Sequence, residues 1–286
     1  MHKIASISEL KATVSQWRKQ ELSIAFVPTM GNLHAGHIKL VREARKKADK
    51  VIVSIFVNPT QFCVGEDFES YPRTELADQD KLEKASTDLL FLPSVFEIYQ
   101  SNATTTISVG GLSKMHCGAH RVGHFDGVAT IVTKLFNMVQ PDLAIFGEKD
   151  FQQLAVIRIM VQELNIPVEI LGVATEREDD GLALSSRNGY LSSHERSIAP
   201  VLYQALCQAR EEILQGQSDF QLIEDQQKKR LQVAGFQVDY FSICKTDDLH
   251  IATEKDDELV ILAAAKLGKP RLIDNVCFSK NKVTTQ

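Results

Sequence analysis

The order of apolar and polar positions divides the first part of the chain, up to about residue 173, into two alternating kinds of segment. Short, nearly continuous apolar runs are typical of strands buried on both faces, whereas apolar residues three or four positions apart are typical of amphipathic helices. The predicted strands cover residues 24–27, 51–57, 88–92, 104–109, 143–146 and 168–173, and the predicted helices cover residues 4–20, 38–47, 75–84, 126–138 and 151–163. This alternation predicts an α/β fold with a doubly wound, parallel, Rossmann-like sheet.

The composition changes near Thr175. Residues 175–181, TEREDDG, are strongly charged and show no core pattern, which is typical of a linker. Beyond them the pattern predicts helices over residues 194–215 and 220–234 and strands over residues 238–244, 258–265 and 271–278. We therefore expect a Rossmann-like domain over residues 1–175 and a smaller α+β domain over residues 176–286.

The bulk composition narrows the function classes. With 286 residues and 44% apolar content, the chain can bury a full core. Its net charge of −5 argues against a broad basic surface for nucleic acid, so small anionic ligands fit better than polymers. The five scattered cysteines are typical of reduced thiols in a cytoplasmic protein. No apolar run approaches the roughly 18 to 20 residues that span a bilayer, and we expect neither export nor membrane binding.

The segment VPTMGNLHAGHIKL, residues 27–40, has the features of a phosphate site. An apolar strand leads through a Gly31 turn into an amphipathic helix, and His34 and His37 lie where that helix begins. A strand-to-helix turn directs unpaired backbone N–H groups and the positive end of the helix dipole at one point, and the imidazoles add donors there. Taken alone, such a pair also suits two surface histidines or part of a metal site.

Two other predicted strands end in polar residues. Asn58 and Gln61 follow the strand over residues 51–57, and Gly147, Glu148, Lys149 and Asp150 follow the strand over residues 143–146. Ligands of open α/β sheets bind at the carboxyl ends of the strands. The second of these segments again combines a glycine, a cation and a helix N-terminus, which predicts a second contact with a phosphate-bearing ligand.

Residues 111–125, GLSKMHCGAHRVGHF, raise the question of a zinc site. His116, His120 and His124 lie four residues apart in a glycine-punctuated segment, and Cys117 has no second thiolate nearby. We therefore favour a loop that offers Arg121 and His124 to an anion.

The segment 184–188, LSSRN, offers two hydroxyl groups and a guanidinium in succession. Ser185, Ser186 and Arg187 suit the oxygens of a phosphate, which arginine binds in bidentate fashion. An ordinary helix-capping turn explains these residues equally well, and the sequence pattern leaves both interpretations open.

Six segments in this order and spacing, PTMGNLHAGH, FVNPTQF, YPRT, HRVGHFDGV, FGEKDFQQL and LSSRN, resemble the pantothenate synthetase (pantoate–β-alanine ligase) family of the nucleotidyltransferase-like α/β superfamily. The H-x-x-H pair is similar to that superfamily's HIGH motif, and LSSRN stands where its KMSKS-type loop stands. The chain lacks GxxxxGK[ST] and GxGxxG, which disfavours a P-loop kinase or a nicotinamide enzyme.

The resemblance implies a two-step ligation. The carboxylate of D-pantoate attacks the α-phosphate of ATP to give pantoyl adenylate and pyrophosphate, and the amine of β-alanine then displaces AMP to form pantothenate. It also implies Mg²⁺ carried mainly by the ATP phosphates, no tightly bound organic cofactor, and a homodimer. The first domain then binds nucleotide and pantoate, and the second acts as a lid that carries LSSRN. Another nucleotidylyltransferase of the superfamily and a non-catalytic nucleotide-binding regulator are the alternatives.

The resemblance also implies roles for individual residues. The ATP-binding positions are Pro28, Thr29, Met30, His34, His37, Gly147, Glu148, Lys149, Asp150, Leu184, Ser185, Ser186 and Arg187. The pantoate-binding positions, at the pantoate and β-alanine end of the site, are Gln61, Gln153, Asn58, Arg121 and His124. Of all these, His34, His37, Lys149 and Arg187 are the expected catalytic residues. Asp78 is a weak candidate for an outer contact with magnesium.

The chain departs from the family pattern at Leu184, where methionine is common, at Ala174 and Glu176, where proline and an apolar residue are usual, and at Val122, where proline is commoner. None of these changes removes a charged or donor group from the implied chemistry. We also expect the charged segment 65–74 to act as a lid, because an adenylate must be shielded from water.

Overall fold

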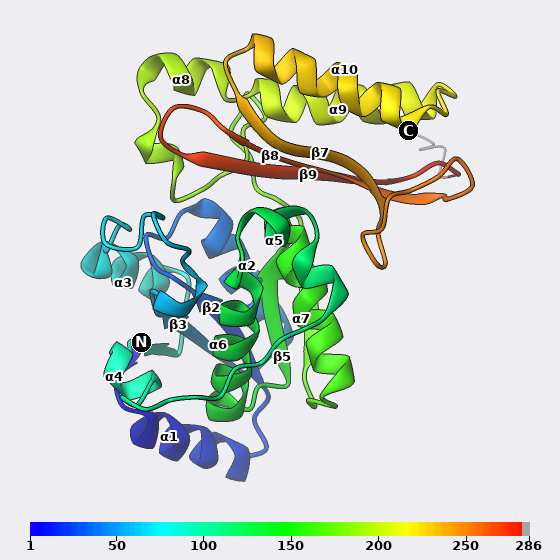
Figure 1. Ribbon diagram of the computed structural model, residues 1–286. Coiled ribbons are helices and arrows are strands. Elements are labelled where there is room, and N and C mark those ends of the chain that lie inside the picture. Colours follow the sequence, from blue (N-terminus) through cyan, green and yellow to red (C-terminus); the bar gives the residue numbers. More distant parts are fainter. Residues whose placement is uncertain (282–286) are drawn as a thin grey trace. The chain divides into compact units, whose positions relative to one another are not determined.

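In the computed structural model, which describes residues 1–281, six parallel strands form one sheet and three antiparallel strands form another (Figure 1). The chain groups into two units, one around each sheet. The first unit comprises Met1–Glu148 and Gln153–Thr175, and the second comprises Lys149–Gln152 and residues 176–281. The expected α/β fold with a doubly wound parallel sheet and a smaller α+β part is confirmed.

The strand order of the parallel sheet is β1-β4-β3-β2-β5-β6. The strands are β1 (His2–Ile4), β2 (Ile24–Thr29), β3 (Lys50–Ile55), β4 (Leu89–Phe91), β5 (Leu143–Gly147) and β6 (Glu169–Val173). From β2 the chain continues outward through β3, and it later returns to the other side of β2 with β5. The order therefore reverses between β2 and β5, which is where doubly wound sheets bind their ligands.

Helices cover both faces of this sheet. They are α1 (Ile7–Lys19), α2 (Ala35–Lys47), α3 (Glu75–Lys84), α6 (His124–Val139) and α7 (Phe151–Glu163), with the short α4 (Val95–Ile98) and α5 (His116–His120) between them. On one face, Val41 and Ala44 of α2 pack in one apolar cluster with Val27. On the other face, the Phe136 ring of α6 meets the Phe26 ring edge-on at 6.5 Å between centroids. Neighbouring strand residues such as Phe26 and Val27 point to opposite faces, so the strands must be apolar throughout.

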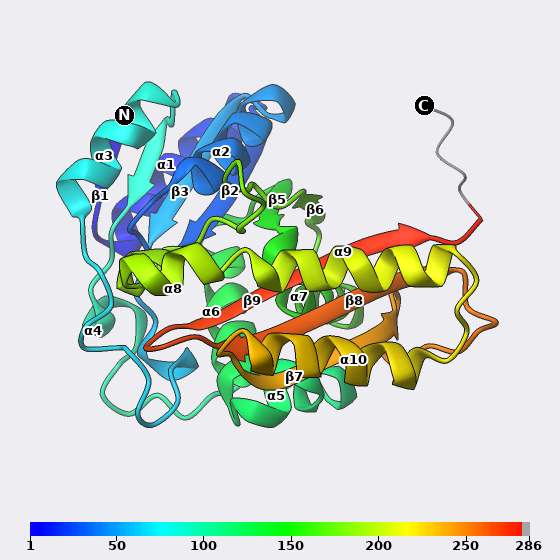
Figure 2. The ribbon, with the colours of Figure 1, turned by 90° about the horizontal axis from the view of Figure 1, so that it is seen from above.

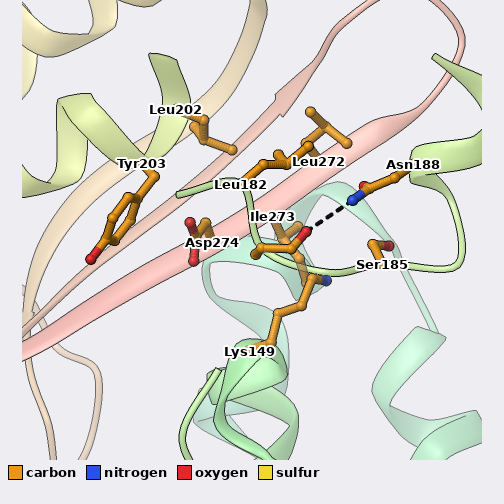
Figure 3. Close-up of a pocket in the computed structure, with 10 residues that line it drawn as sticks. Lys149, Leu182, Ser185, Asn188, Leu202, Tyr203, Leu272, Ile273 and Asp274 are labelled. Atoms are coloured by element: carbon orange, nitrogen blue, oxygen red, sulfur yellow. Dashed lines mark hydrogen bonds between the residues drawn. The ribbon is translucent and has the colours of Figure 1, made fainter. Parts of the chain in front are cut away.

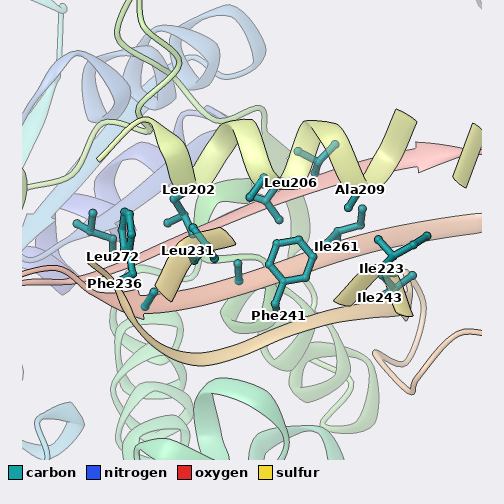
Figure 4. Packing of buried hydrophobic residues seen from close by; sticks show 14 of the residues in the cluster. Leu202, Leu206, Ala209, Ile223, Leu231, Phe236, Phe241, Ile243, Ile261 and Leu272 are labelled. Carbon is teal, nitrogen blue, oxygen red and sulfur yellow. The ribbon is translucent and has the colours of Figure 1, made fainter. Parts of the chain in front are cut away.

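The second unit folds around an antiparallel sheet in the order β7-β8-β9. Its elements are α8 (Ser193–Ile198), α9 (Val201–Leu214), α10 (Phe220–Val233), β7 (Gln237–Lys245), β8 (Glu258–Lys266) and β9 (Arg271–Ser279). Helices α9 and α10 lie side by side along the three strands (Figure 2). Leu206, Ile223, Phe241 and Ile261 form the core between helices and sheet (Figure 4).

Three predictions of secondary structure are wrong. Residues 104–109 form no strand, because Ile107 and Ser108 bond to the side chains of Thr130 and Asp126 on α6 rather than to a neighbouring strand. The helix predicted over residues 194–215 is divided into α8 and α9 at Pro200, which has no N–H to continue the hydrogen-bond ladder. The segment predicted as helix from residue 4 begins instead with strand β1, and α1 starts only at Ile7.

Candidate active site

The turn between β2 and α2 has a backbone that few sequences can adopt. Gly31 has φ +82°, and a Cβ there would lie 3.0 Å from Ile55 Cγ2. The fully buried Asp78 carboxylate accepts the N–H groups of Asn32 and Leu33, both at 2.8 Å. Asp78 therefore shapes this turn from the α3 side. Both oxygens of this buried carboxylate already accept backbone hydrogen bonds.

His34 and His37 lie at the N-terminus of α2, where the sequence places them. The Nδ1 atom of His37 accepts the backbone N–H of His34 at 3.3 Å, and the two ring centroids are 4.0 Å apart. An Nδ1 atom that accepts a hydrogen bond carries no proton, so the neutral His37 ring has its proton on Nε2. The helix terminus and this Nε2–H group are both suited to binding an anion.

The polar residues after β3 form a fixed group around a short helical turn, η1 (Pro59–Gln61). Asn58 is only 1% exposed; its Nδ2 donates to Gln61 Oε1 at 3.0 Å and its Oδ1 accepts the Tyr99 hydroxyl at 2.9 Å. Gln61 Nε2 in turn donates to the Sδ atom of Met30 at 3.2 Å. Asn58 therefore helps to orient the Gln61 side chain.

Helix α6 packs unusually close to this group. A Cβ at Gly127 would lie 2.2 Å from the carbonyl oxygen of Thr60, so only glycine allows the approach. The Gly127 carbonyl also accepts a hydrogen bond from Asn58 Nδ2 at 3.2 Å. The position of Gln61 therefore depends on a glycine that is distant in the sequence.

Arg121 and His124 lie together, as the sequence suggests, and both connect to the segment around Gln61. Arg121 donates from Nε and Nη2 to the two oxygens of Glu66, at 2.6 and 2.7 Å. His124 Nδ1 donates to the Gln61 carbonyl at 2.7 Å, and its Nε2 accepts from Arg121 Nη1 at 2.9 Å. This pattern fixes His124 as a neutral ring, since a carbonyl only accepts hydrogen bonds.

The Arg121–Glu66 pair perturbs both groups. Burial by itself raises the pKa of Glu66, but the hydrogen bonds and positive charge of Arg121 outweigh it and the pKa is lowered. Burial likewise opposes the charged form of Arg121, and the Glu66 carboxylate more than compensates, so the pKa of Arg121 is raised. Both groups are therefore charged at neutral pH. Val122, which differs from the family pattern, is 85% exposed, so its side chain does not pack into this network.

The segment after β5 contributes to both units. Gly147 and Glu148 belong with the parallel sheet, whereas Lys149 and Asp150 group with the second unit. The last three of these residues form the short η3 (Glu148–Asp150). The Lys149 carbonyl accepts a hydrogen bond from Asn275 Nδ2 at 3.0 Å. Asp150 is exposed, and Gln153 is half-buried in the first turn of α7.

The LSSRN segment follows a narrow hairpin in the second unit. The hairpin closes through a bridge between Arg177 and Ala183 and a hydrogen bond from Leu184 N–H to the Glu176 carbonyl at 2.9 Å. Glu176 thus contributes its backbone to the hairpin. Asn188 Nδ2 donates to the Ala183 carbonyl at 3.0 Å, which fixes the end of the segment (Figure 3).

The four residues before Asn188 are partly exposed, so their side chains are accessible. These are Leu184, Ser185, Ser186 and Arg187. The Ser185 hydroxyl accepts the backbone N–H of Arg187 at 3.2 Å, which bends the segment into a compact turn. A turn of this kind also explains the capping-like pattern seen in the sequence.

A narrow hollow in the second unit brings several of these residues together. Lys149, Ser185, Asn188, Tyr203 and Asp274 line it, and Figure 3 shows the Lys149 side chain extending into it. Its water-accessible volume is about 10 Å³, which admits about one water molecule. Lys149 and Ser185 therefore face a common space, although they are distant in the sequence.

Several residues of these networks carry no signal in the sequence. Glu66 stands in a charged loop, Gly127 lies inside a helical pattern, and Asp274 and Asn275 lie inside a predicted strand. Asn188 stands inside LSSRN and Gly127 inside HRVGHFDGV, but neither segment by itself indicates these contacts. Within residues 1–281, no group of three or more histidine, cysteine or acidic residues is arranged to hold a metal ion. A helix long and apolar enough to cross a membrane is likewise not found among these residues.

Comparisons with known proteins agree with this architecture. The family model of the pantoate-beta-alanine ligases matches residues 2–277. Pantothenate synthetase of Stutzerimonas stutzeri is 56% identical over 279 residues, which cover 96% of this chain and 97% of the relative. The crystal structure of pantothenate synthetase from Thermus thermophilus superposes with a TM-score of 0.91 at 44% identity, covering 96% of this chain and 99% of the other.

A further solved structure comes from a complex. It is that of pantoate-beta-alanine ligase from Francisella tularensis complexed with beta-gamma ATP and beta-alanine. It superposes with a TM-score of 0.83 at 34% identity and covers 99% of this chain and 98% of its own. The similarity to these proteins therefore extends over both units.

Proposed function

This chain belongs to the pantoate-beta-alanine ligase family, and we propose that it activates the carboxylate of D-pantoate as an adenylate before β-alanine attacks. The overall reaction condenses D-pantoate with β-alanine to pantothenate, using ATP and releasing AMP and pyrophosphate. The observation that carries the proposal is the hydrogen bond from His34 N–H to His37 Nδ1. It leaves an Nε2–H donor on His37 at a helix N-terminus, which suits the phosphates of ATP.

In the first step, a carboxylate oxygen of pantoate attacks the α-phosphorus of ATP and the bond to pyrophosphate breaks. Negative charge increases on the phosphate oxygens, so the reaction needs fixed donors and cations rather than a protein nucleophile. His34, His37 and Lys149 supply those donors. Ser185, Ser186 and Arg187 bind the β- and γ-phosphates and then pyrophosphate.

The remaining ATP contacts are assigned by their positions. Pro28 and Thr29 end the central strand β2 and Met30 follows it, while Gly147 ends its neighbour β5 and Glu148 follows that strand. These two strands flank the point where the strand order reverses, which is the usual nucleotide position in this architecture. Asp150 binds the ribose, and Leu184 contacts the adenine.

In the second step, the amine of β-alanine attacks the acyl carbon of the adenylate. The bond to AMP breaks, the amide forms, and the amine loses a proton. Gln61 and Gln153 bind pantoate, because a side-chain amide can donate to a carboxylate and accept from a hydroxyl group. Arg121 and His124 lie at the β-alanine end, and Asn58 orients Gln61.

Magnesium accompanies the phosphates of ATP. This cation keeps several waters and takes few protein ligands when phosphates are present. Asp78 is buried and accepts two backbone hydrogen bonds, so we assign it to shaping the turn before His34 and leave the cation on the phosphates. We further propose a cytoplasmic homodimer without a tightly bound organic cofactor, nucleic acid or membrane partner, as family membership implies.

Residues 65–74 act as a lid over the adenylate. Glu66 bonds to Arg121, while the rings of Phe68 and Tyr71 pack on Phe62 at 5.3 and 5.8 Å between centroids. These contacts give the segment a defined closed position next to Gln61. Water that reaches an acyl adenylate hydrolyses it, so a closed segment at this edge increases the yield of pantothenate.

Pyrophosphate exchange tests the adenylation step directly. Labelled pyrophosphate is incubated with the enzyme, ATP, Mg²⁺ and D-pantoate in the absence of β-alanine. We expect label to enter ATP only when pantoate is present. Exchange that requires a phosphate-bearing acceptor instead identifies another nucleotidylyltransferase, and the complete absence of turnover identifies a regulator.

A further inference from the structure

We propose that Asn275, together with the Arg177–Asp274 pair, is a positioning device that holds Lys149 at a fixed place relative to the Ser185–Ser186–Arg187 turn. The inference rests on the proposed role of Lys149 in adenylation. It assigns a function to three residues of the second unit that are not among the expected substrate-binding positions.

The first element of the device is the contact with Lys149 itself. Asn275 Nδ2 donates to the Lys149 carbonyl at 3.0 Å, and Asn275 is only 7% exposed. Its backbone lies in β9, where it pairs with Leu262 of the central strand β8. The amide group is therefore carried by a strand that is paired along its whole length, and it fixes the backbone from which the Lys149 side chain extends.

The second element is a buried ion pair beside this contact. Arg177 donates from Nη1 and Nη2 to the two oxygens of Asp274, at 2.6 and 2.9 Å. The Asp274 side chain is 3% exposed, and the Arg177 guanidinium lies 3.7 Å from the centroid of the Tyr203 ring. Arg177 Nη2 also donates to the Asn275 carbonyl at 3.3 Å, so the pair and Asn275 form one network.

The third element connects this network to the phosphate-binding turn. Arg177 lies in the hairpin that precedes Ser185, where it bridges to Ala183 and donates from Nη1 to the Gly181 carbonyl at 3.1 Å. A Cβ at Gly181, which has φ +92°, would lie 2.6 Å from the Tyr203 ring, so the hairpin packs tightly there. One guanidinium thus holds both the hairpin that carries Ser185 and the strand that holds Lys149.

The arrangement explains why Lys149 groups with the second unit although its neighbours Glu148 and Gln153 group with the first. Lys149 and Ser185 line the same hollow, and the network sets the distance between them (Figure 3). Stabilisation of a developing phosphate charge requires donors that are already in place. Asn275 therefore acts on catalysis through Lys149.

Charge in the hollow supports the same assignment. The Asp274 carboxylate faces Lys149 and is bonded on both oxygens by Arg177. Burial raises the pKa of Asp274, and Arg177 and the more distant Lys149 counteract that rise. Arg177 is therefore the main counter-charge of Asp274, and Lys149 contributes less.

Substitution of Asn275 tests the device. In Asn275→Ala we expect pantoate-dependent pyrophosphate exchange to fall roughly ten- to a hundredfold in kcat, with KM for ATP changed by less than about twofold, since a misplacement near 1 Å has that effect. Asn275→Asp has the same shape but no donor when ionised. Its rate relative to the wild type is expected to rise as pH falls, because a protonated carboxyl group can donate to the Lys149 carbonyl. Cys277→Ala, at an exposed position of the same strand, is the matched control.

A double-variant cycle separates this inference from the proposed function. We expect Asn275→Ala to add no further loss in the Lys149→Ala background. An equal loss in both backgrounds, or a wild-type rate for Asn275→Ala, overturns the inference. A Lys149→Ala enzyme with a normal rate overturns the proposed role of Lys149 instead. Thermal unfolding of each variant reports folding, and if Asn275→Ala does not fold, the pH dependence of Asn275→Asp decides.

Discussion

Arg121 and Glu66 form a bidentate ion pair, with Arg121 Nε and Nη2 at 2.6 and 2.7 Å from the two carboxylate oxygens. The pair joins the segment 65–74 to the start of α6. It also continues through His124 to the carbonyl of Gln61, a proposed pantoate contact. The closed position of the lid and the position of Gln61 therefore depend on the same interaction.

Glu66→Gln is expected to weaken lid closure while the chemistry of adenylation remains. The amide cannot accept two charge-assisted hydrogen bonds, so the segment opens more often and water reaches the adenylate. The measurement is the ratio of AMP to pantothenate formed, expected to rise above one. Glu69→Gln, an exposed change in the same segment, is the control and should keep the ratio near one. Equal ratios in both variants contradict the lid role.

The ion pair also predicts a pH dependence of the lid. The pKa of Glu66 is lowered in the folded protein from its ordinary value of 4.5. The stabilisation that the ionised carboxylate gives to the closed segment is therefore present above pH 4.5 and is lost as pH falls through the lowered pKa. Glu66 Oε2 also accepts the Cys63 backbone N–H at 3.0 Å. Hydrogen exchange of that amide, corrected for intrinsic rates, should accelerate below about pH 4.5. An unchanged profile in Glu66→Gln would falsify the assignment.

Gly127→Ala is expected to displace Gln61. The new Cβ would lie 2.2 Å from the Thr60 carbonyl oxygen, so the turn η1 must move. Overpacking of this kind costs about 1–3 kcal/mol, partly offset by the roughly 1 kcal/mol that alanine contributes in a helix. KM for pantoate should rise more than KM for ATP in the exchange assay. Gly110→Ala, where a Cβ meets nothing within 4 Å, is the control, and a matching rise in that variant would count against the explanation.

Asp78→Asn tests the role of the buried carboxylate. An amide presents only one acceptor atom, so the N–H of Asn32 or of Leu33 loses its partner. We expect a loss of about 1–3 kcal/mol in stability and a higher KM for ATP, because the turn before His34 loosens. The Mg²⁺ dependence should stay as in the wild type and in the exposed control Asp80→Asn. A changed Mg²⁺ requirement specific to Asp78→Asn would indicate that Asp78 takes part in magnesium binding.

The sequence predicts the parallel sheet well for a physical reason. Strands such as β2 are buried on both faces, so their apolar runs are visible without knowledge of their neighbours. Residues 104–109 have the composition of a strand but no strand partner, and the donor Ile107 N–H bonds to a side chain of α6 instead. Pairing is a property of the whole fold, which a local pattern cannot reveal.

The residues of the candidate site likewise differ in how well the sequence predicts them. Segments with donors at strand ends, such as His34 with His37, are visible because the chemistry needs those side chains at fixed spacing. The role of Asn275 cannot be predicted from the sequence, because a polar residue within an apolar strand has no evident function until its partner is known. That partner, Lys149, lies 126 positions away. Supporting residues are recognised by contacts, and contacts between distant segments require the structure.

Lys149→Ala is expected to reduce the pantoate-dependent exchange rate by roughly 10²- to 10³-fold, the usual effect of losing one preorganised donor to a developing charge. Folding should remain intact, because the Lys149 carbonyl that Asn275 contacts is unchanged by the substitution. The exchange rate and the thermal unfolding midpoint are measured on the same preparations. Lys149→Arg keeps the charge on a wider, planar group, so a partial rate is expected there. If Lys149→Ala exchanged label as fast as the wild type, the ammonium group would have no part in adenylation, and the donors on α2 would have to supply that stabilisation.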